Sequence, residues 1–127
     1  MLFNSNCAEG LLSWFDINKR SMPWRDSKDP YAIWISEIML QQTRVNQALP
    51  FFNRFMSAFP SLQHLAAAST QQVLKQWEGL GYYSRARNIH KTAQLVIENY
   101  AGILPKDYKE LLSLPGIGPY TAAAIAS

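Results

Sequence analysis

The 127-residue sequence lacks the features that define several classes of protein. Its one cysteine, Cys7, permits no internal disulfide, and no zinc or iron–sulfur site can be built from this chain's cysteines alone. The longest uncharged stretch, residues 55–74, contains Pro60, Gln63 and His64 and so cannot cross a bilayer. Residues 1–10 lack the basic start and apolar core of a secretory signal. We expect a cytoplasmic protein that does not contact membranes.

Charged residues are also scarce, at 17% of the chain against 48% hydrophobic residues. This balance allows one apolar core to be buried, which excludes a disordered tail. Twelve Lys and Arg against nine Asp and Glu give a net charge of +3. So small an excess attracts polyanions only where the basic residues cluster, so charge alone does not indicate nucleic-acid binding. A slightly basic soluble domain is the plainer interpretation of the composition.

The spacing of apolar residues predicts an all-α fold, because they recur at intervals of three and four and do not alternate with polar residues. Asp29 and Pro30 are typical of a helix start, Ser69 with Gln72 predicts a capping box, and Pro50 predicts a kink or break. Helices are expected at residues 7–17, 31–42, 45–58, 61–68, 69–79, 84–100, 107–112 and 119–127.

The segment Leu-Leu-Ser-Leu-Pro-Gly-Ile-Gly-Pro-Tyr-Thr, residues 111–121, joins two of the expected helices through a Gly-x-Gly turn. Glycine allows the backbone to approach a ligand closely, and free N–H groups at a turn and a helix start can hold a phosphate. The segment resembles the helix-hairpin-helix motif of DNA-binding proteins. The alternative is an ordinary turn between two helices.

Glu37 lies in an otherwise apolar predicted helix. Burial beside apolar neighbours such as Trp34 would desolvate its carboxyl and raise the pKa toward the working range of a general acid. The alternative is a structural ion pair with Arg20 or Arg25. Taken by itself, the residue leaves both interpretations open.

A third group of residues has the chemistry to open a DNA duplex. It joins Gln41, Gln42 and Thr43, at the end of the glutamate helix, to the segment Gly-Leu-Gly-Tyr-Tyr-Ser-Arg-Ala-Arg at residues 79–87. Amide side chains read base edges, tyrosines stack on bases and arginines contact phosphates. Core packing is the alternative for the two tyrosines, and we expect one of them to be buried.

Together these motifs resemble the MutY family of adenine DNA glycosylases, within the helix-hairpin-helix superfamily. The resemblance runs from about residue 11 to residue 127 and is carried, in order, by Pro23-Trp24-Arg25, Asp29-Pro30-Tyr31, residues 34–43, residues 79–87 and the Gly-x-Gly segment. It implies an incomplete six-helix barrel over residues 21–127, with the helix-hairpin-helix at about 107–127. Residues 1–20 would be a helix of a second, cluster-side module. The last helix shows no stop signal, so we expect a chain truncated at its C-terminus.

The resemblance implies a monofunctional enzyme of base excision repair. It would act on double-stranded DNA, flip out an adenine mispaired with 8-oxoguanine or guanine, and remove it by protonation from Glu37 at N7. Endonuclease III carries a catalytic lysine where this chain has Tyr120, so a Schiff base cannot form by that route. The resemblance places an anion-supplying aspartate, the cysteines of a 4Fe-4S cluster and an 8-oxoguanine recognition domain beyond residue 127. No cofactor is expected within 1–127, and the chain alone is expected to be inactive.

The resemblance also assigns roles to individual residues. The catalytic group would comprise Glu37 and Tyr120. The adenine pocket would be lined by Arg20, Trp24, Arg25, Leu40 and Val45, together with Tyr120. The opposite base and the gap in the stack would be engaged by Gln42, Thr43, Leu80 and Tyr82. The DNA backbone would be held by Arg85, Gly116 and Gly118. Two alternatives are a non-catalytic helix-hairpin-helix DNA-binding module and a helical scaffold that binds another protein.

Overall fold

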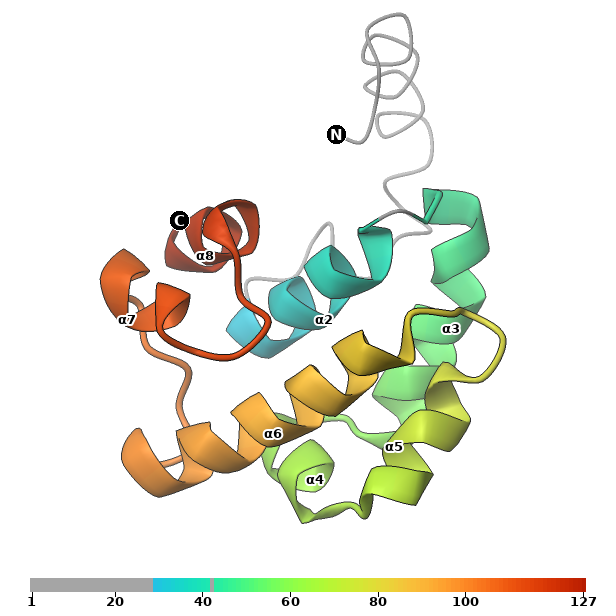
Figure 1. Cartoon of the computed structure of the whole chain (residues 1–127), viewed down its shortest axis with the longest axis horizontal. Coiled ribbons are helices and arrows are strands. Elements are labelled where there is room, and N and C mark those ends of the chain that lie inside the picture. Colours follow the sequence, from blue (N-terminus) through green and yellow to red (C-terminus); the bar gives the residue numbers. More distant parts are fainter. Residues whose placement is uncertain (1–28, 42) are drawn as a thin grey trace, which may run out of the picture.

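The computed structural model describes residues 29–41 and 43–127, so the helix expected at 7–17 and the module assigned to 1–20 lie outside the described residues. The described part contains helices and no strands, which confirms the all-α prediction. In chain order the helices are α2 (Pro30–Leu40), α3 (Val45–Ala58), α4 (Leu62–Ala67), α5 (Thr70–Trp77), α6 (Tyr83–Asn99), α7 (Tyr108–Leu112) and α8 (Pro119–Ala126) (Figure 1). None of them is long and apolar enough to span a bilayer.

Local sequence accounts for where several helices begin. The side chain of Asp29 accepts a hydrogen bond of 3.1 Å from the Tyr31 N–H, and Pro30 occupies the first turn of α2. Ser69 accepts from the Gln72 N–H at 3.1 Å, and the Gln72 side chain accepts in return from the Ser69 N–H at 2.8 Å. These contacts satisfy donors that a helix start leaves free, and they confirm both predicted caps.

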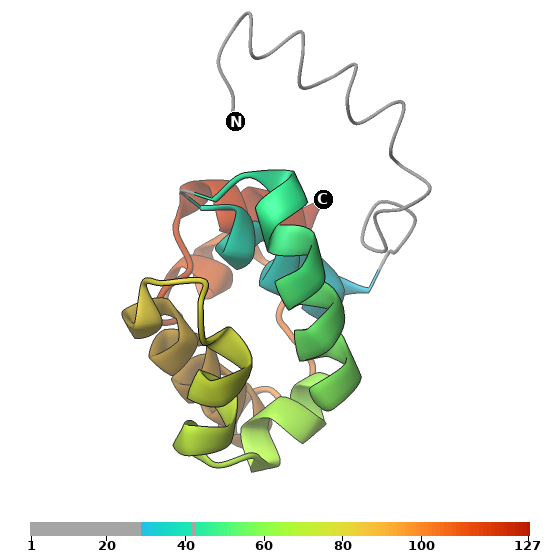
Figure 2. The ribbon, with the colours of Figure 1, turned by 90° about the vertical axis from the view of Figure 1, so that its right-hand side faces the viewer.

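The break suggested by Pro50 does not occur, because α3 continues through this residue to Ala58. The proline lies on the exposed side of the helix, where water can replace the hydrogen bond that its missing N–H removes. Figure 2 shows α3 as an uninterrupted helix that runs from the α2 end of the molecule toward α4.

The core is apolar: α2 packs against α3 and α8, and α6 packs against α4 and α5. Trp34 and Ile35 of α2 are almost inaccessible to solvent. The ring of Phe55 meets that of Trp77 edge-on at 5.9 Å, which joins α3 to α5. Figure 1 shows the connection between α7 and α8 lying across the space between α2 and α6.

Candidate functional site

Glu37 is half-buried midway along α2, between the buried residues Ser36 and Ile38. Burial raises the pKa of its carboxyl above the ordinary value, because loss of water disfavours the charged form. No described residue pairs with the carboxyl. Arg20 and Arg25, the alternative partners, lie outside the described residues. This environment suits a group that must keep its proton until a substrate receives it.

Residues 113–118, the hairpin, come very close to α6. Gly116 has a φ of +80°, and a Cβ added there would lie 2.9 Å from the Cβ of Asn88. The hydroxyl of Thr92 donates a 2.7 Å hydrogen bond to the Pro115 carbonyl. Only glycine satisfies both the backbone conformation and the close approach at position 116.

The hairpin also presents backbone donors. Within the described residues, the N–H groups of Gly116 and Gly118 have no acceptor. Gly118 caps α8 without a side-chain hydrogen bond, and the space where its Cβ would stand is open. Unpaired N–H groups at a helix start form a suitable site for an anion such as a phosphate.

Residues 79–82 form a loop between α5 and α6, and three of them have positive φ: Gly79 at 94°, Gly81 at 86° and Tyr82 at 55°. Tyr82 is 54% exposed and Tyr83 is 40% exposed, so the expectation that one tyrosine would be buried is wrong. The space below the loop is occupied by Trp77, whose indole N–H donates to the Gly81 carbonyl at 2.8 Å. Both tyrosine rings therefore stay at the surface.

Gln41, the C-cap of α2, connects the loop and the hairpin helix. Its side-chain amide donates to the Thr121 hydroxyl at 3.4 Å, and its backbone carbonyl accepts from the guanidinium of Arg85. Arg85 also lies over the ring of Tyr82, 4.5 Å from its centroid. The DNA-backbone role assigned to Arg85 stays a prediction, and in the structure its guanidinium makes contacts within the protein.

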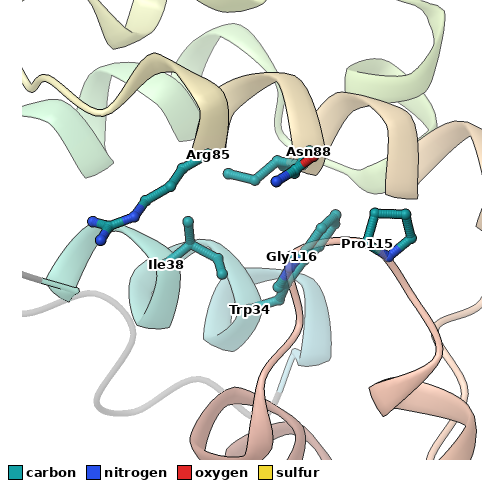
Figure 3. Close-up of a pocket in the computed structure, with 7 residues that line it drawn as sticks. Trp34, Ile38, Arg85, Asn88, Pro115 and Gly116 are labelled. Carbon is teal, nitrogen blue, oxygen red and sulfur yellow. The ribbon is translucent and has the colours of Figure 1, made fainter.

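A small pocket opens where α2, α6 and the hairpin meet (Figure 3). Figure 3 shows Asn88 projecting from α6 toward Gly116, above Trp34 of α2. The residues that line the pocket are Trp34, Ile38, Arg85, Asn88, Ile89, Pro115 and Gly116. Sequence reasoning missed Asn88, because its contact is with a glycine far along the chain and nothing in its own segment indicates it.

The other predicted site residues in the described part of the chain differ in their burial. Leu40, Thr43 and Leu80 are partly buried, Val45 is buried in the core, and Tyr120 is 90% exposed in the first turn of α8. The residues that lie outside the described part are Arg20, Trp24, Arg25 and Gln42. In the described residues no group of three His, Cys, Asp or Glu side chains could hold a metal ion. The structure thus brings the end of α2, the 79–82 loop and the hairpin together.

Residues 35–124 match the family described as HhH-GPD superfamily base excision DNA repair protein. The chain belongs to this superfamily. Among relatives of this HhH-GPD chain, the adenine DNA glycosylase of Buchnera aphidicola subsp. Acyrthosiphon pisum is 46% identical over 118 residues, covering 92% of the chain and 34% of the relative. The adenine DNA glycosylase of Homo sapiens is 46% identical over 126 residues, covering 92% of the chain and 23% of the relative. The chain therefore spans about a third or less of these relatives.

Solved structures agree with the helical architecture. A thermostable thymine-DNA glycosylase superposes with a TM-score of 0.78 at 30% identity, covering 91% of this chain and 54% of that one. A non-covalent endonuclease III–DNA complex gives a TM-score of 0.72 over 94% of this chain and 58% of that one. Its identity is 22%, so this second similarity supports the fold alone.

Proposed function

We propose that this chain supplies the acid and part of the DNA-binding surface of an adenine DNA glycosylase. The observation that carries the proposal is Glu37, a half-buried carboxyl with a raised pKa on a helix that packs against α8 of the hairpin motif. A purely structural role in DNA binding would not require an acid in this position. The relatives named adenine DNA glycosylase support the same substrate class.

In the proposed reaction, Glu37 donates its proton to N7 of a flipped adenine. The electron pair of the N-glycosidic bond then leaves with the base. Water attacks C1′ of the cationic sugar and passes a proton to the Glu37 carboxylate left by the first step. Tyr120 offers no amine, so no Schiff base can form at this position. A carboxylate that stabilises the sugar cation is proposed to lie outside these 127 residues.

The proposed substrate is double-stranded DNA with adenine opposite 8-oxoguanine or guanine. Gly116 and Gly118 would hold a phosphate through their unpaired N–H groups. Thr43, Leu80 and Tyr82 would fill the gap left by the flipped base. The exposure of the Tyr82 ring supports this role, because a stacking residue must be free to reach a base.

An iron–sulfur cluster is proposed only for the full-length protein. A 4Fe-4S cluster needs four thiolates, and this chain has the single cysteine Cys7, so its residues do not fit that group. The cluster would require cysteines outside the chain, and no step of the proposed reaction depends on it.

The test measures single-turnover adenine excision by the full-length protein on an A·8-oxoguanine duplex. Glu37→Gln keeps the shape of the side chain and removes the acid, so excision should become undetectable while duplex affinity stays within about twofold. Glu98→Gln, at an exposed position of α6, is the matched control and should excise at the normal rate.

Normal excision by Glu37→Gln would show that the assigned acid is wrong. Equal affinity of the wild-type protein for duplexes with and without the mispair, with no excision, would favour a non-catalytic helix-hairpin-helix module. The 127-residue chain alone should give no measurable turnover.

A further inference from the structure

The two segments to which the proposed function assigns DNA contacts, the 79–82 loop and the hairpin, are joined through Gln41. Its carbonyl accepts a hydrogen bond from the Arg85 guanidinium at the start of α6. Its side-chain amide reaches the hydroxyl of Thr121, which lies in the first turn of α8 directly after the hairpin and is 2% exposed. A single residue at the end of α2 therefore contacts the helices that follow both segments.

The contacts of Gln41 with Arg85 and Thr121 form a junction, and Arg85 connects this junction to the exposed 79–82 loop. Its guanidinium lies 4.5 Å from the centroid of the Tyr82 ring, and its backbone N–H donates to the Tyr82 carbonyl at 2.9 Å. Tyr82 has a φ of 55°, a conformation that residues with a Cβ rarely adopt unless their surroundings hold them in it. Because the ring is half exposed, burial is not what holds it.

We propose that Arg85 and Gln41 are positioning residues that make the 79–82 loop and the hairpin engage DNA as one unit. This inference rests on the proposed function, which assigns DNA contacts to both the 79–82 loop and the hairpin. A planar guanidinium can donate to a carbonyl along its edge while an aromatic ring stacks on its face, and a lysine ammonium cannot do both in this way. Phosphate binding at the hairpin then favours the arrangement in which Tyr82 is ready to enter the base stack.

Gln41 links Arg85 to Thr121. We therefore expect that substitutions at Arg85 and at Thr121 do not have additive effects on base unstacking by the protein. Arg85→Ala removes the link to the loop, and Thr121→Val removes the hydroxyl that holds Gln41 while keeping the side-chain shape. Side chains within one contact network commonly show coupled effects, whereas independent sites give additive ones. The contact of Arg85 with Tyr82 should restrict opening of the loop. Hydrogen exchange of the loop amides should therefore be slower in the wild type than in Arg85→Ala.

The first measurement uses full-length protein without DNA, so it does not depend on the proposed function. Hydrogen exchange is followed in peptides that contain residues 79–83, with Arg87→Ala as the matched control, since Arg87 carries the same charge on the exposed side of α6. Arg85→Ala should accelerate exchange in this segment by about threefold or more, and Arg87→Ala should leave it unchanged. Unchanged exchange in Arg85→Ala would overturn the proposal.

The second measurement uses a mispaired duplex that carries 2-aminopurine beside the mispair, whose fluorescence rises when the base is unstacked. At saturating protein, Arg85→Ala should lower this signal about twofold or more, and Arg85→Lys should not restore it. In the double variant Arg85→Ala with Thr121→Val, the 2-aminopurine signal should fall by a smaller factor than the product of the factors measured for the two single variants. A wild-type signal in Arg85→Ala, full rescue by lysine or strictly multiplicative losses would each contradict the positioning role.

The two measurements separate this inference from the proposed function. Accelerated loop exchange in a protein that binds no mispaired duplex would refute the proposed function and leave the positioning contact standing. If Arg85→Ala does not fold, Thr121→Val provides the same exchange and fluorescence tests from the other end of the junction. With that variant, unchanged loop exchange and an unchanged 2-aminopurine signal would overturn the coupling.

Discussion

The side of the molecule formed by α4, α5 and α6 and the edge formed by the end of α2, the 79–82 loop and the hairpin are held together differently. On the first side, apolar residues such as Leu65, Val73 and Trp77 are fully buried. At the edge, Leu114 and Ile117 of the hairpin are also buried, but individual polar contacts join segments distant in sequence, and the rings of Tyr82 and Tyr120 are exposed. Changes to the buried residues of the first side should therefore lower stability, whereas changes to exposed groups at the edge should mainly alter ligand binding.

The two regions should differ most in stability when Trp77 and Tyr82 are each replaced. Trp77→Ala removes a fully buried ring and should lower the free energy of unfolding by about 3–5 kcal/mol. Tyr82→Gly removes an exposed ring and relieves a positive φ, so stability should change by no more than about 1 kcal/mol. Denaturant unfolding measures both values, and equal losses would remove the distinction between the two regions.

The next prediction contrasts the two glycines of the hairpin. Gly116→Ala meets both a φ of +80° and the Cβ of Asn88 at 2.9 Å, so it should cost about 1–3 kcal/mol of stability. Gly118 has a φ of −92° and open space at its Cβ, so Gly118→Ala should cost under about 0.5 kcal/mol. Its methyl group would occupy the proposed phosphate position, and duplex affinity, measured by fluorescence anisotropy, should fall severalfold. Unchanged affinity in a stable Gly118→Ala protein would exclude that position.

A smaller effect is expected from the capping box of α5, on the side away from the edge. Ser69→Ala removes the hydroxyl that accepts from the Gln72 N–H, so thermal unfolding should show a loss of about 1 kcal/mol. Ser57→Ala, at an exposed position in the last turn of α3, serves as the control for the loss of a serine hydroxyl. Neither variant should alter duplex affinity. A change in duplex affinity with Ser69→Ala would contradict the distinction between the two regions.

A weaker effect should be a dependence of stability on pH that comes from Glu37. Its raised pKa means that the folded protein binds the proton more tightly than the unfolded chain. The linked stability is fully present below the ordinary glutamate pKa and is lost as the pH rises through the folded value. The Tm of Glu37→Gln should therefore exceed that of the wild type at neutral pH, and the difference should shrink toward pH 4. A difference that grows as the pH falls would contradict the raised pKa.

Several features of the protein follow from contacts between residues that are neighbours in the chain. The caps at Asp29 and Ser69, the all-α class and the desolvated Glu37 follow from hydrogen bonds within one turn and from the apolar spacing of the helices. The turn at Gly116 was predicted from its glycine pattern, because positive φ favours that residue type. The roles assigned by resemblance, including those of Leu40, Val45 and Tyr120, stay predictions.

How these parts meet depends on the packing of the whole chain. The approach of Asn88 to Gly116 and the contacts that Gln41 makes with Arg85 and Thr121 join segments far apart along the chain. Local sequence does not encode such distances, because they depend on how the helices pack against one another as a whole. Packing also left both tyrosines after Gly81 at the surface, since Trp77 already occupies the space beneath the loop.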